Sequence, residues 1–265
     1  MTIRFILPVA LLALAGCNEA AIPEAEIESI VDSKPAATSI YENAVASSGR
    51  TDGDRERDAG RKPDQVLEFF AIEPGMTVLD MFSGGGYYTE MLSNIVGRDG
   101  KVVAHSNQSY AQYVGDEPKV RFADSRLANV EILMAENNEL ELPADTFDAV
   151  MMVLAYHDIY YESPEYSWLK IDGPKLLAEF FSGLKSGGIL AIVDHYAAAG
   201  SPRETGGTLH RIDPGIVIAE IEAAGFVLDS QSDVLRNLED DHSLNMSDEQ
   251  IRGKTDRFIM KFRKP

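Results

Sequence analysis

Residues 76–92 read MTVLDMFSGGGYYTEML, and this stretch decides the fold of the chain. Its apolar first part, residues 76–82, predicts a buried strand, and residues 87–96 predict a helix. Between them stand glycines 84–86, which allow positive φ and a close approach of the backbone to a ligand. The start of a helix also offers unpaired N–H groups to a carboxylate or phosphate. The stretch therefore indicates a ligand-binding loop at the end of a strand, with a plain tight turn as the alternative.

Outward from this stretch, strands and helices alternate to the end of the chain. Further strands are predicted at residues 101–105, 130–135, 147–155, 189–194, 226–230 and 257–263. Further helices are predicted at residues 63–70, 174–184 and 214–224. The strand at 147–155 is apolar enough to be buried on both faces. This alternation indicates an α/β fold, with a mostly parallel sheet that helices cover on both faces.

The composition excludes several classes of protein. The chain has 265 residues, of which 45% are hydrophobic and 25% charged, so it can bury a sizeable core. A single cysteine excludes a disulfide scaffold. Asp and Glu number 43 against 24 Lys and Arg, for a net charge of −19, so we expect no nucleic-acid partner. The same charge repels an anionic lipid surface unless an anchor holds the protein there.

The first residues are typical of an export signal and not of a folded domain. Residues 1–16 combine one arginine with a short apolar run, and residues 14–17 (LAGC) resemble a bacterial lipobox. This predicts that Cys17 is lipidated and that the lipid alone holds the protein on a membrane of the bacterial cell envelope, facing the periplasm. Asn18, directly after the cysteine, favours the outer membrane. The alternative is a buried N-terminal helix with an incidental cysteine.

The rest of the chain divides into two parts. Residues 17–49 are rich in Ala, Ser and Glu without a sustained period, which predicts a flexible tether. Residues 50–265 have no second boundary in composition and are expected to form one domain. At its start, residues 50–62 are dense in both charge signs and predict a surface loop or the beginning of a helix, although their four arginines also suit an anion.

Two later motifs make the glycine loop more specific. Residues 147–150 (FDAV) and 184–190 (LKSGGIL) follow residues 78–86 in order, and residues 223–226 (AAGF) form a closing turn. Together they resemble the class I S-adenosylmethionine-dependent methyltransferases over residues 63–265. With the lipobox, the chain resembles a group of predicted bacterial secreted methyltransferases. The resemblance implies a Rossmann-like, mostly parallel sheet of seven strands with the last one antiparallel, and S-adenosylmethionine as the cofactor.

The resemblance also implies which residues bind the cofactor. They are Asp80, Phe82, Ser83, Gly84, Gly85, Gly86, Ser106, Asn107 and Asn138. Asp80 and the glycines would line the methionine end, and Asn138 stands near the position of an aspartate that contacts adenine. Two positions depart from the family pattern. Phe82 replaces a glycine, and Ser106 and Asn107 stand where the family has a carboxylate for the ribose, a stronger acceptor than either.

Histidine–aspartate pairs follow two predicted strands. His157 and Asp158 come after residues 147–155, Asp194 and His195 end the next strand, and His210 follows. Because the carboxyl ends of parallel strands meet at one edge of a sheet, we expect these five side chains to lie together as a catalytic group. An imidazole beside a carboxylate is an oriented general base, able to take a proton from a methyl acceptor. The alternative is that they cap strands and bond to loop backbone.

The same pairs offer ligands for a divalent metal ion. Asp158, Asp194 and His195 are the expected ligands, since some metal-dependent O-methyltransferases of this fold place carboxylates at the two aspartate positions. The other two histidines, His105 and His242, are expected to have no role. The aromatic residues after the fourth strand either wall an aromatic or cationic substrate or form a lid packed on the sheet edge. They are Tyr156, Tyr160, Tyr161, Tyr166 and Trp168.

The sequence thus predicts a lipid-anchored, S-adenosylmethionine-dependent methyltransferase that acts on a small molecule. One alternative is a metal-binding or metal-dependent envelope lipoprotein on the same fold, without the cofactor. A second alternative is a non-catalytic binding module of the envelope.

Overall fold

The computed structural model describes residues 38–265. The expected export signal, Cys17 and most of the expected tether lie outside the described residues. None of the helices that the structure describes is both long and apolar enough to cross a membrane.

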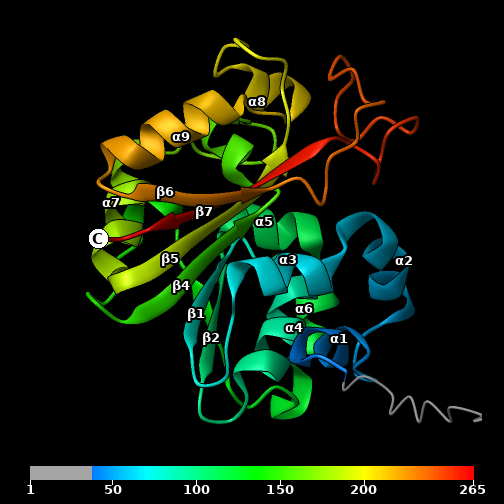
Figure 1. The fold of residues 1–265 in the computed structure, drawn as a ribbon, viewed down its shortest axis with the longest axis vertical. Coiled ribbons are helices and arrows are strands. Elements are labelled where there is room, and N and C mark those ends of the chain that lie inside the picture. Colours follow the sequence, from blue (N-terminus) through cyan, green and yellow to red (C-terminus); the bar gives the residue numbers. More distant parts are fainter. Residues whose placement is uncertain (1–37) are drawn as a thin grey trace, which may run out of the picture. The chain divides into compact units, whose positions relative to one another are not determined.

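Within residues 38–265, the strands form one seven-stranded sheet (Figure 1). They are β1 (Thr77–Met81), β2 (Lys101–Ser106), β3 (Val130–Met134), β4 (Phe147–Val153), β5 (Leu184–His195), β6 (Val227–Ser232) and β7 (Arg257–Arg263). Their order is β3-β2-β1-β4-β5-β7-β6, and β7 runs antiparallel to both of its neighbours. The predicted seven-stranded, mostly parallel sheet with an antiparallel last strand is confirmed.

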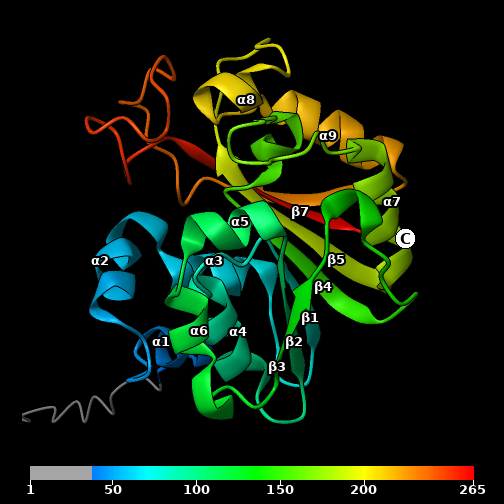
Figure 2. The same ribbon diagram turned by 180° about the vertical axis from the view of Figure 1, so that it is seen from behind.

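The helices pack on both faces of this sheet. They are α1 (Ile40–Val45), α2 (Asp52–Arg61), α3 (Pro63–Phe70), α4 (Tyr87–Val96), α5 (Gln108–Val114), α6 (Glu117–Arg121), α7 (Gly173–Gly183), α8 (Thr205–Leu209) and α9 (Pro214–Ala223). Because side chains alternate along a strand, Val78 of β1 joins a core with α1, α3 and α4, whereas Leu79 joins a second core with α7 and α9. Figures 1 and 2 show the helices from opposite sides.

The structure differs from the expected elements at several boundaries. The end of the expected tether forms α1, which Ser39 and Glu42 begin with a capping box and which buries Ala44 against α3 and α4. The charged residues 50–62 contain the helix α2. The strand β5 starts at Leu184 and not at residue 189, so residues expected to end a helix belong to it. Short helices such as α5, α6 and α8 have too few residues to show a period.

The pairing of β1, β4 and β5 positions the site. Met81 of β1 pairs with Met152 of β4, and Val153 of β4 pairs with Val193 of β5, all in parallel. The segments that follow these three strands therefore leave the sheet at the same edge, which is where ligands bind in open α/β sheets.

Candidate active site

The loop after β1 has the backbone of a ligand-binding loop. Gly84 and Gly86 have φ of 59° and 82°, and Gly86 stands directly before α4. Phe82 also has a positive φ, 55°, although it replaces the family's glycine. Asp80, at the end of β1, is buried and accepts a hydrogen bond from Thr89 Oγ1 at 2.6 Å. Burial raises the pKa of the Asp80 carboxyl to about 7, against the opposing effect of the Thr89 hydrogen bonds.

The helix α6 packs closely against the glycines of this loop. A Cβ atom at Gly85 would lie 2.3 Å from the Glu117 carboxylate, and one at Gly86 would lie 2.6 Å from the side chain of Arg121. Arg121 also donates a hydrogen bond from Nε to the carbonyl oxygen of Gly85 at 2.5 Å. Gly86 therefore combines a positive φ with the close approach of α6, whereas Gly84 has only the positive φ and Gly85 only the close approach.

Buried ion pairs hold α6 in this place. Arg121 pairs with Asp54 of α2 at 2.8 Å and with Glu90 of α4 at 2.6 Å, and all three side chains are buried. Arg126 pairs with the second oxygen of Glu90 at 2.6 Å. Burial favours a raised pKa for Asp54, but the hydrogen bonds and charge of Arg121 outweigh it and lower the pKa to about 2. Sequence reasoning missed this network, because charged residues so far apart along the chain form no local pattern.

A pocket of about 750 Å³ opens beside the glycine loop. Ser83, Gly84 and Ser106, three of the expected cofactor residues, line it together with Ile132 and Met134 of β3. Its volume and its mixture of apolar walls and a few polar groups suit a ligand of the size of S-adenosylmethionine. These residues fit the cofactor that the glycine loop implies.

The two expected asparagines are engaged elsewhere. The Asn107 side chain accepts a hydrogen bond from the Tyr110 backbone at 2.7 Å and so caps α5. The side chain of Asn138 bonds to the backbone of Lys170 and Asp172. Its neighbour Asn137 is buried instead, and its side-chain oxygen has no hydrogen-bond partner among the residues that the structure describes.

His105, which was expected to have no role, lies at the end of β2 beside the glycine loop. Its ring is buried and packs edge to face with the ring of Phe82, with 5.5 Å between the two ring centroids. Its Nε2 lies 3.0 Å from the Ala135 carbonyl oxygen. Burial lowers the pKa of His105 to about 4, so the ring is neutral, with Nε2 as donor and Nδ1 as acceptor. Within residues 38–265, Nδ1 has no hydrogen-bond partner, and neither has the indole nitrogen of nearby Trp168. Buried polar atoms of this kind find their partner in ordered water, an ion or a polar ligand.

The aromatic residues after β4 divide between two tasks. The ring of Trp168 stacks on that of Phe82 with 5.7 Å between their centroids, and its centroid lies 5.9 Å from that of the Tyr161 ring. Tyr156 and Tyr160 donate hydrogen bonds to Glu220 of α9. The fifth aromatic side chain, Tyr166, is exposed. The packing of this segment over the sheet edge agrees with the lid interpretation, and its Tyr161–Trp168 pair joins the glycine loop to the histidines.

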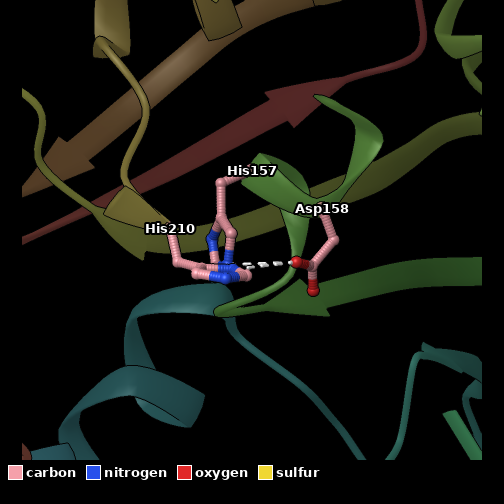
Figure 3. A group of neighbouring side chains, drawn as sticks. All are labelled: His157, Asp158 and His210. Atoms are coloured by element: carbon pink, nitrogen blue, oxygen red, sulfur yellow. Dashed lines mark ion pairs between the residues drawn. The ribbon is translucent and has the colours of Figure 1, made fainter. Parts of the chain in front are cut away.

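The structure brings four of the five expected His and Asp side chains together. His157 Nδ1 lies 2.7 Å from one oxygen of Asp194, and the backbone N–H of His157 donates to the other oxygen at 2.8 Å. On the opposite side of the ring, Nε2 of His157 lies 3.3 Å from Asp158. His210 Nδ1 lies 3.4 Å from the same oxygen of Asp158. Figure 3 shows His157, Asp158 and His210 pointing toward one another.

The carboxylates dominate the electrostatics of this group. Burial favours a lowered pKa for His157, but the charges of Asp194 and Asp158 outweigh it and raise the pKa to about 10. Burial favours a raised pKa for Asp158, but the neighbouring histidines lower it to about 2. The two carboxylates therefore strongly stabilise a positive charge that lies between them.

His195 lies next to this group, with its ring centroid 5.8 Å from that of His157, but makes no ion pair with either carboxylate in the part of the chain that the structure describes. Its Nδ1 lies 2.7 Å from Thr255 Oγ1, and burial together with Arg257 lowers its pKa. The geometry therefore gathers His157, Asp158 and His210, and not the expected metal ligands Asp158, Asp194 and His195. His210, which directly follows α8, was not among the metal ligands expected from the strand pairs.

The comparisons with known proteins agree with the fold. Residues 58–160 match the family model of protein-L-isoaspartate(D-aspartate) O-methyltransferase. The chain is 30% identical over 129 residues to the ubiquinone/menaquinone biosynthesis C-methyltransferase UbiE of Vibrio campbellii, covering 49% of this chain and 45% of the relative. An equal match is found with UbiE of Vibrio parahaemolyticus. The chain thus spans less than half the length of the curated relatives it matches.

Solved structures resemble a larger part of the chain. A S-adenosylmethionine-dependent methyltransferase of Aquifex aeolicus is 25% identical with a TM-score of 0.55, covering 79% of this chain and 98% of its own. The [4+2]-cyclase SpnF shares the fold at 18% identity and a TM-score of 0.51, covering 83% of this chain and 86% of its own. Because a cyclase shares this fold, the reaction has to be argued from the site.

Proposed function

We propose that this chain, a member of the class I S-adenosylmethionine-dependent methyltransferase superfamily, transfers the methyl group of that cofactor to a small molecule. One observation carries the proposal. The glycine loop after β1 lies beside the segment after β4 that carries Asp158, because β1 pairs directly with β4, and an oxygen of Asp158 lies 3.4 Å from Nδ1 of His210. A cofactor loop and a proton-accepting group next to it are the two parts that methyl transfer to an O–H or N–H group needs.

The cofactor would bind in the pocket beside the glycine loop, held by residues of this chain. Ser83, Gly84 and Ser106 line the pocket, and Asp80 lies buried at the end of β1. The unpaired Nδ1 of His105 offers one further acceptor. When bound, S-adenosylmethionine supplies the methyl group on a positively charged sulfur, so that the protein has only to position the acceptor and remove its proton.

The acceptor would meet the histidines. His210 has 24% of its side chain exposed, more than His157 or Asp158, and its Nδ1 faces Asp158. We therefore assign proton removal to the His210–Asp158 pair and the positioning of the group to Asp194 through His157. A small molecule is the proposed acceptor because the net charge of −19 argues against nucleic acid.

Calorimetric titration of the full chain with S-adenosylmethionine tests the proposal. We expect a Kd in the micromolar range, about −8 kcal/mol. Asp80→Ala is expected to abolish binding, whereas Asp233→Ala, at a side chain that is 90% exposed, leaves it unchanged. Absence of binding by the unaltered chain at millimolar cofactor would overturn the cofactor assignment.

A second candidate function rests on the departures in the loop. Phe82 fills the place of a glycine, and the Asn107 side chain, at the position of the family's ribose carboxylate, caps a helix. These observations favour a metal-binding or metal-dependent envelope protein that does not use the cofactor. In that case, titration with S-adenosylmethionine gives no heat of binding, whereas the group of His157, Asp158 and His210 still binds a metal ion.

We also propose that the protein is a lipoprotein of the bacterial envelope, held through Cys17 and facing the periplasm. The support is the sequence of residues 14–17 and the acidic charge, which requires an anchor for membrane contact. Mass spectrometry of the purified protein tests this. A first residue other than a lipid-modified Cys17 overturns it.

A further inference from the structure

We propose that His157, Asp158 and His210 bind one divalent transition-metal ion of the zinc class. One ring nitrogen of each histidine and one carboxylate oxygen of Asp158 lie within 4.8 Å of one another. Two imidazole nitrogens and one carboxylate oxygen are a donor set that Zn²⁺ and Fe²⁺ take in proteins, whereas Mg²⁺ prefers oxygen ligands. The argument does not depend on methyl transfer.

The distances in the group match a tetrahedral site. Ligands about 2.0–2.1 Å from a tetrahedral zinc ion lie about 3.3 Å from one another. The Asp158 oxygen lies 3.3 Å from Nε2 of His157 and 3.4 Å from Nδ1 of His210. Both distances are longer than the 2.7 Å between His157 and Asp194, which is a charge-assisted hydrogen bond. Two of the three edges therefore already have the length that a tetrahedral site requires, and the two histidine nitrogens lie within 4.8 Å of each other.

The outer contact of His157 is the one that metal-binding histidines make. Such a histidine donates its second ring N–H to a carboxylate, which fixes the tautomer and the direction of the free lone pair. Asp194 accepts from Nδ1 of His157 and from its backbone N–H. This leaves Nε2 as the atom that faces Asp158 and His210. Asp194, which the sequence marked as a metal ligand, acts instead by orienting one.

The site is closed on one side and open on the other. The side chain of His157 is 1% exposed, whereas those of Asp158 and His210 are 14% and 24% exposed. The ring of Tyr161 lies 5.0 Å from His210, on the path to the glycine loop. Three protein ligands with one open position are the arrangement of a catalytic ion, since structural zinc sites have four protein ligands.

An ion in this place would change the way in which an acceptor loses its proton. It would occupy both imidazole nitrogens, so that His210 is no longer free as a base. A hydroxyl group bound at the open position would then have a lower pKa because of the ion's charge. Chelation separates the two modes: activity that depends on the His210–Asp158 pair survives removal of the metal, and activity that depends on the ion does not.

Zinc titration of the full chain tests the site. The chain is first treated with a chelator, and Cys17 is alkylated so that its thiol does not bind zinc. We expect one Zn²⁺ per chain, and binding at least about 100-fold weaker in His210→Ala and in Asp158→Asn. The control is His242→Ala, because His242 also pairs with a carboxylate, Asp256 at 3.0 Å, and is similarly exposed at 21%. This control is expected to bind zinc as the unaltered chain does.

Two results would overturn the proposal. One is the absence of zinc binding by the unaltered chain, and the other is unchanged affinity in His210→Ala and Asp158→Asn. Circular dichroism shows whether each variant is folded, and Asp158→Asn, which keeps the size of the side chain, decides if His210→Ala is not. A cofactor titration of the same sample keeps the two proposals apart, since loss of cofactor binding with zinc retained contradicts only the methyltransferase.

Discussion

His157 and Asp194 are joined twice: the ring Nδ1 and the backbone N–H of His157 each meet a different oxygen of the Asp194 carboxylate. The first bond fixes the orientation of the ring, and the second fixes the chain after β4 to the end of β5. A single side chain thus sets both where the histidine lies and which nitrogen it presents to Asp158 and His210.

Asp194→Asn tests this double contact. The amide has the size of the carboxylate but lacks its charge and can accept only at its oxygen. We expect the free energy of unfolding, measured in urea, to fall by about 1.5–3 kcal/mol, which is the usual contribution of hydrogen bonds to a charged group. Zinc affinity is expected to fall about 10–100-fold, because the outer partner of a ligand is lost. Unchanged stability would mean that the two bonds contribute little.

Gly86→Ala tests the close approach of α6 to the loop. The residue has φ of 82°, and its Cβ would lie 2.6 Å from Arg121, which ion pairs hold in place. Left-handed backbone costs a residue other than glycine about 1–2 kcal/mol, and overpacking adds about 1–3 kcal/mol. Gly53→Ala in α2 is the matched control, since the nearest atom to its Cβ lies at 3.9 Å. Equal thermal stability of the two variants would contradict the prediction.

Arg121→Met is expected to destabilise the protein by about 3–5 kcal/mol, because Asp54 and Glu90 are left buried without their partner. Lys119→Met, which removes the exposed pair with Asp116, is expected to cause no measurable change. Chemical denaturation of both variants makes the comparison. A small effect of Arg121→Met would show that α6 does not depend on the network.

The stability of the folded chain should depend on Asp54 in acid. Its pKa is lowered to about 2 in the folded state, below the 3.8 of an unperturbed aspartate, so the folded form binds this proton less readily than the unfolded chain does. The contribution is complete above pH 4 and is lost as the pH falls toward 2. We expect Asp54→Asn to flatten this part of the stability profile, measured by thermal unfolding between pH 2 and pH 6.

Asp80 should show the opposite dependence. Its pKa is raised to about 7 by burial, so the folded protein keeps a proton that the unfolded chain has released, and ionisation of Asp80 opposes folding as the pH rises from 4 to 7. Asp80→Asn is therefore expected to stabilise the protein at pH 8, by up to about 4 kcal/mol, and to leave it unchanged at pH 4. The same variant should lose cofactor affinity. Lower stability at pH 8 would contradict this account.

Much of the fold followed from local pattern. The buried strands were predicted because burial on both faces leaves a continuous apolar run. The loop at residues 84–86 was predicted from its three glycines, which allow positive φ. The short helices α5, α6 and α8 were not, because helices of five to seven residues depend on packing more than on their own sequence.

The candidate site was predictable only where strand order determined it. Asp80 and Asp194 lie near the ends of β1 and β5, and His157 and Asp158 follow β4, so the order of these parallel strands brings them to one edge. His195 belongs to the same strand end but turns toward Thr255, which comes from a distant segment. Such contacts across the chain have no signature in sequence, and the same holds for the orphaned Nδ1 of His105.

The stacking of Trp168 on Phe82 has a practical consequence. Trp168 is the single tryptophan of the chain and lies buried next to the glycine loop, and its indole nitrogen has no hydrogen-bond partner in the described part of the chain. A ligand that enters beside Phe82 would change the polarity around this indole. The intrinsic fluorescence of the unlabelled protein therefore reports on one place only, so that emission spectra can follow the filling of the loop in real time and without a dye.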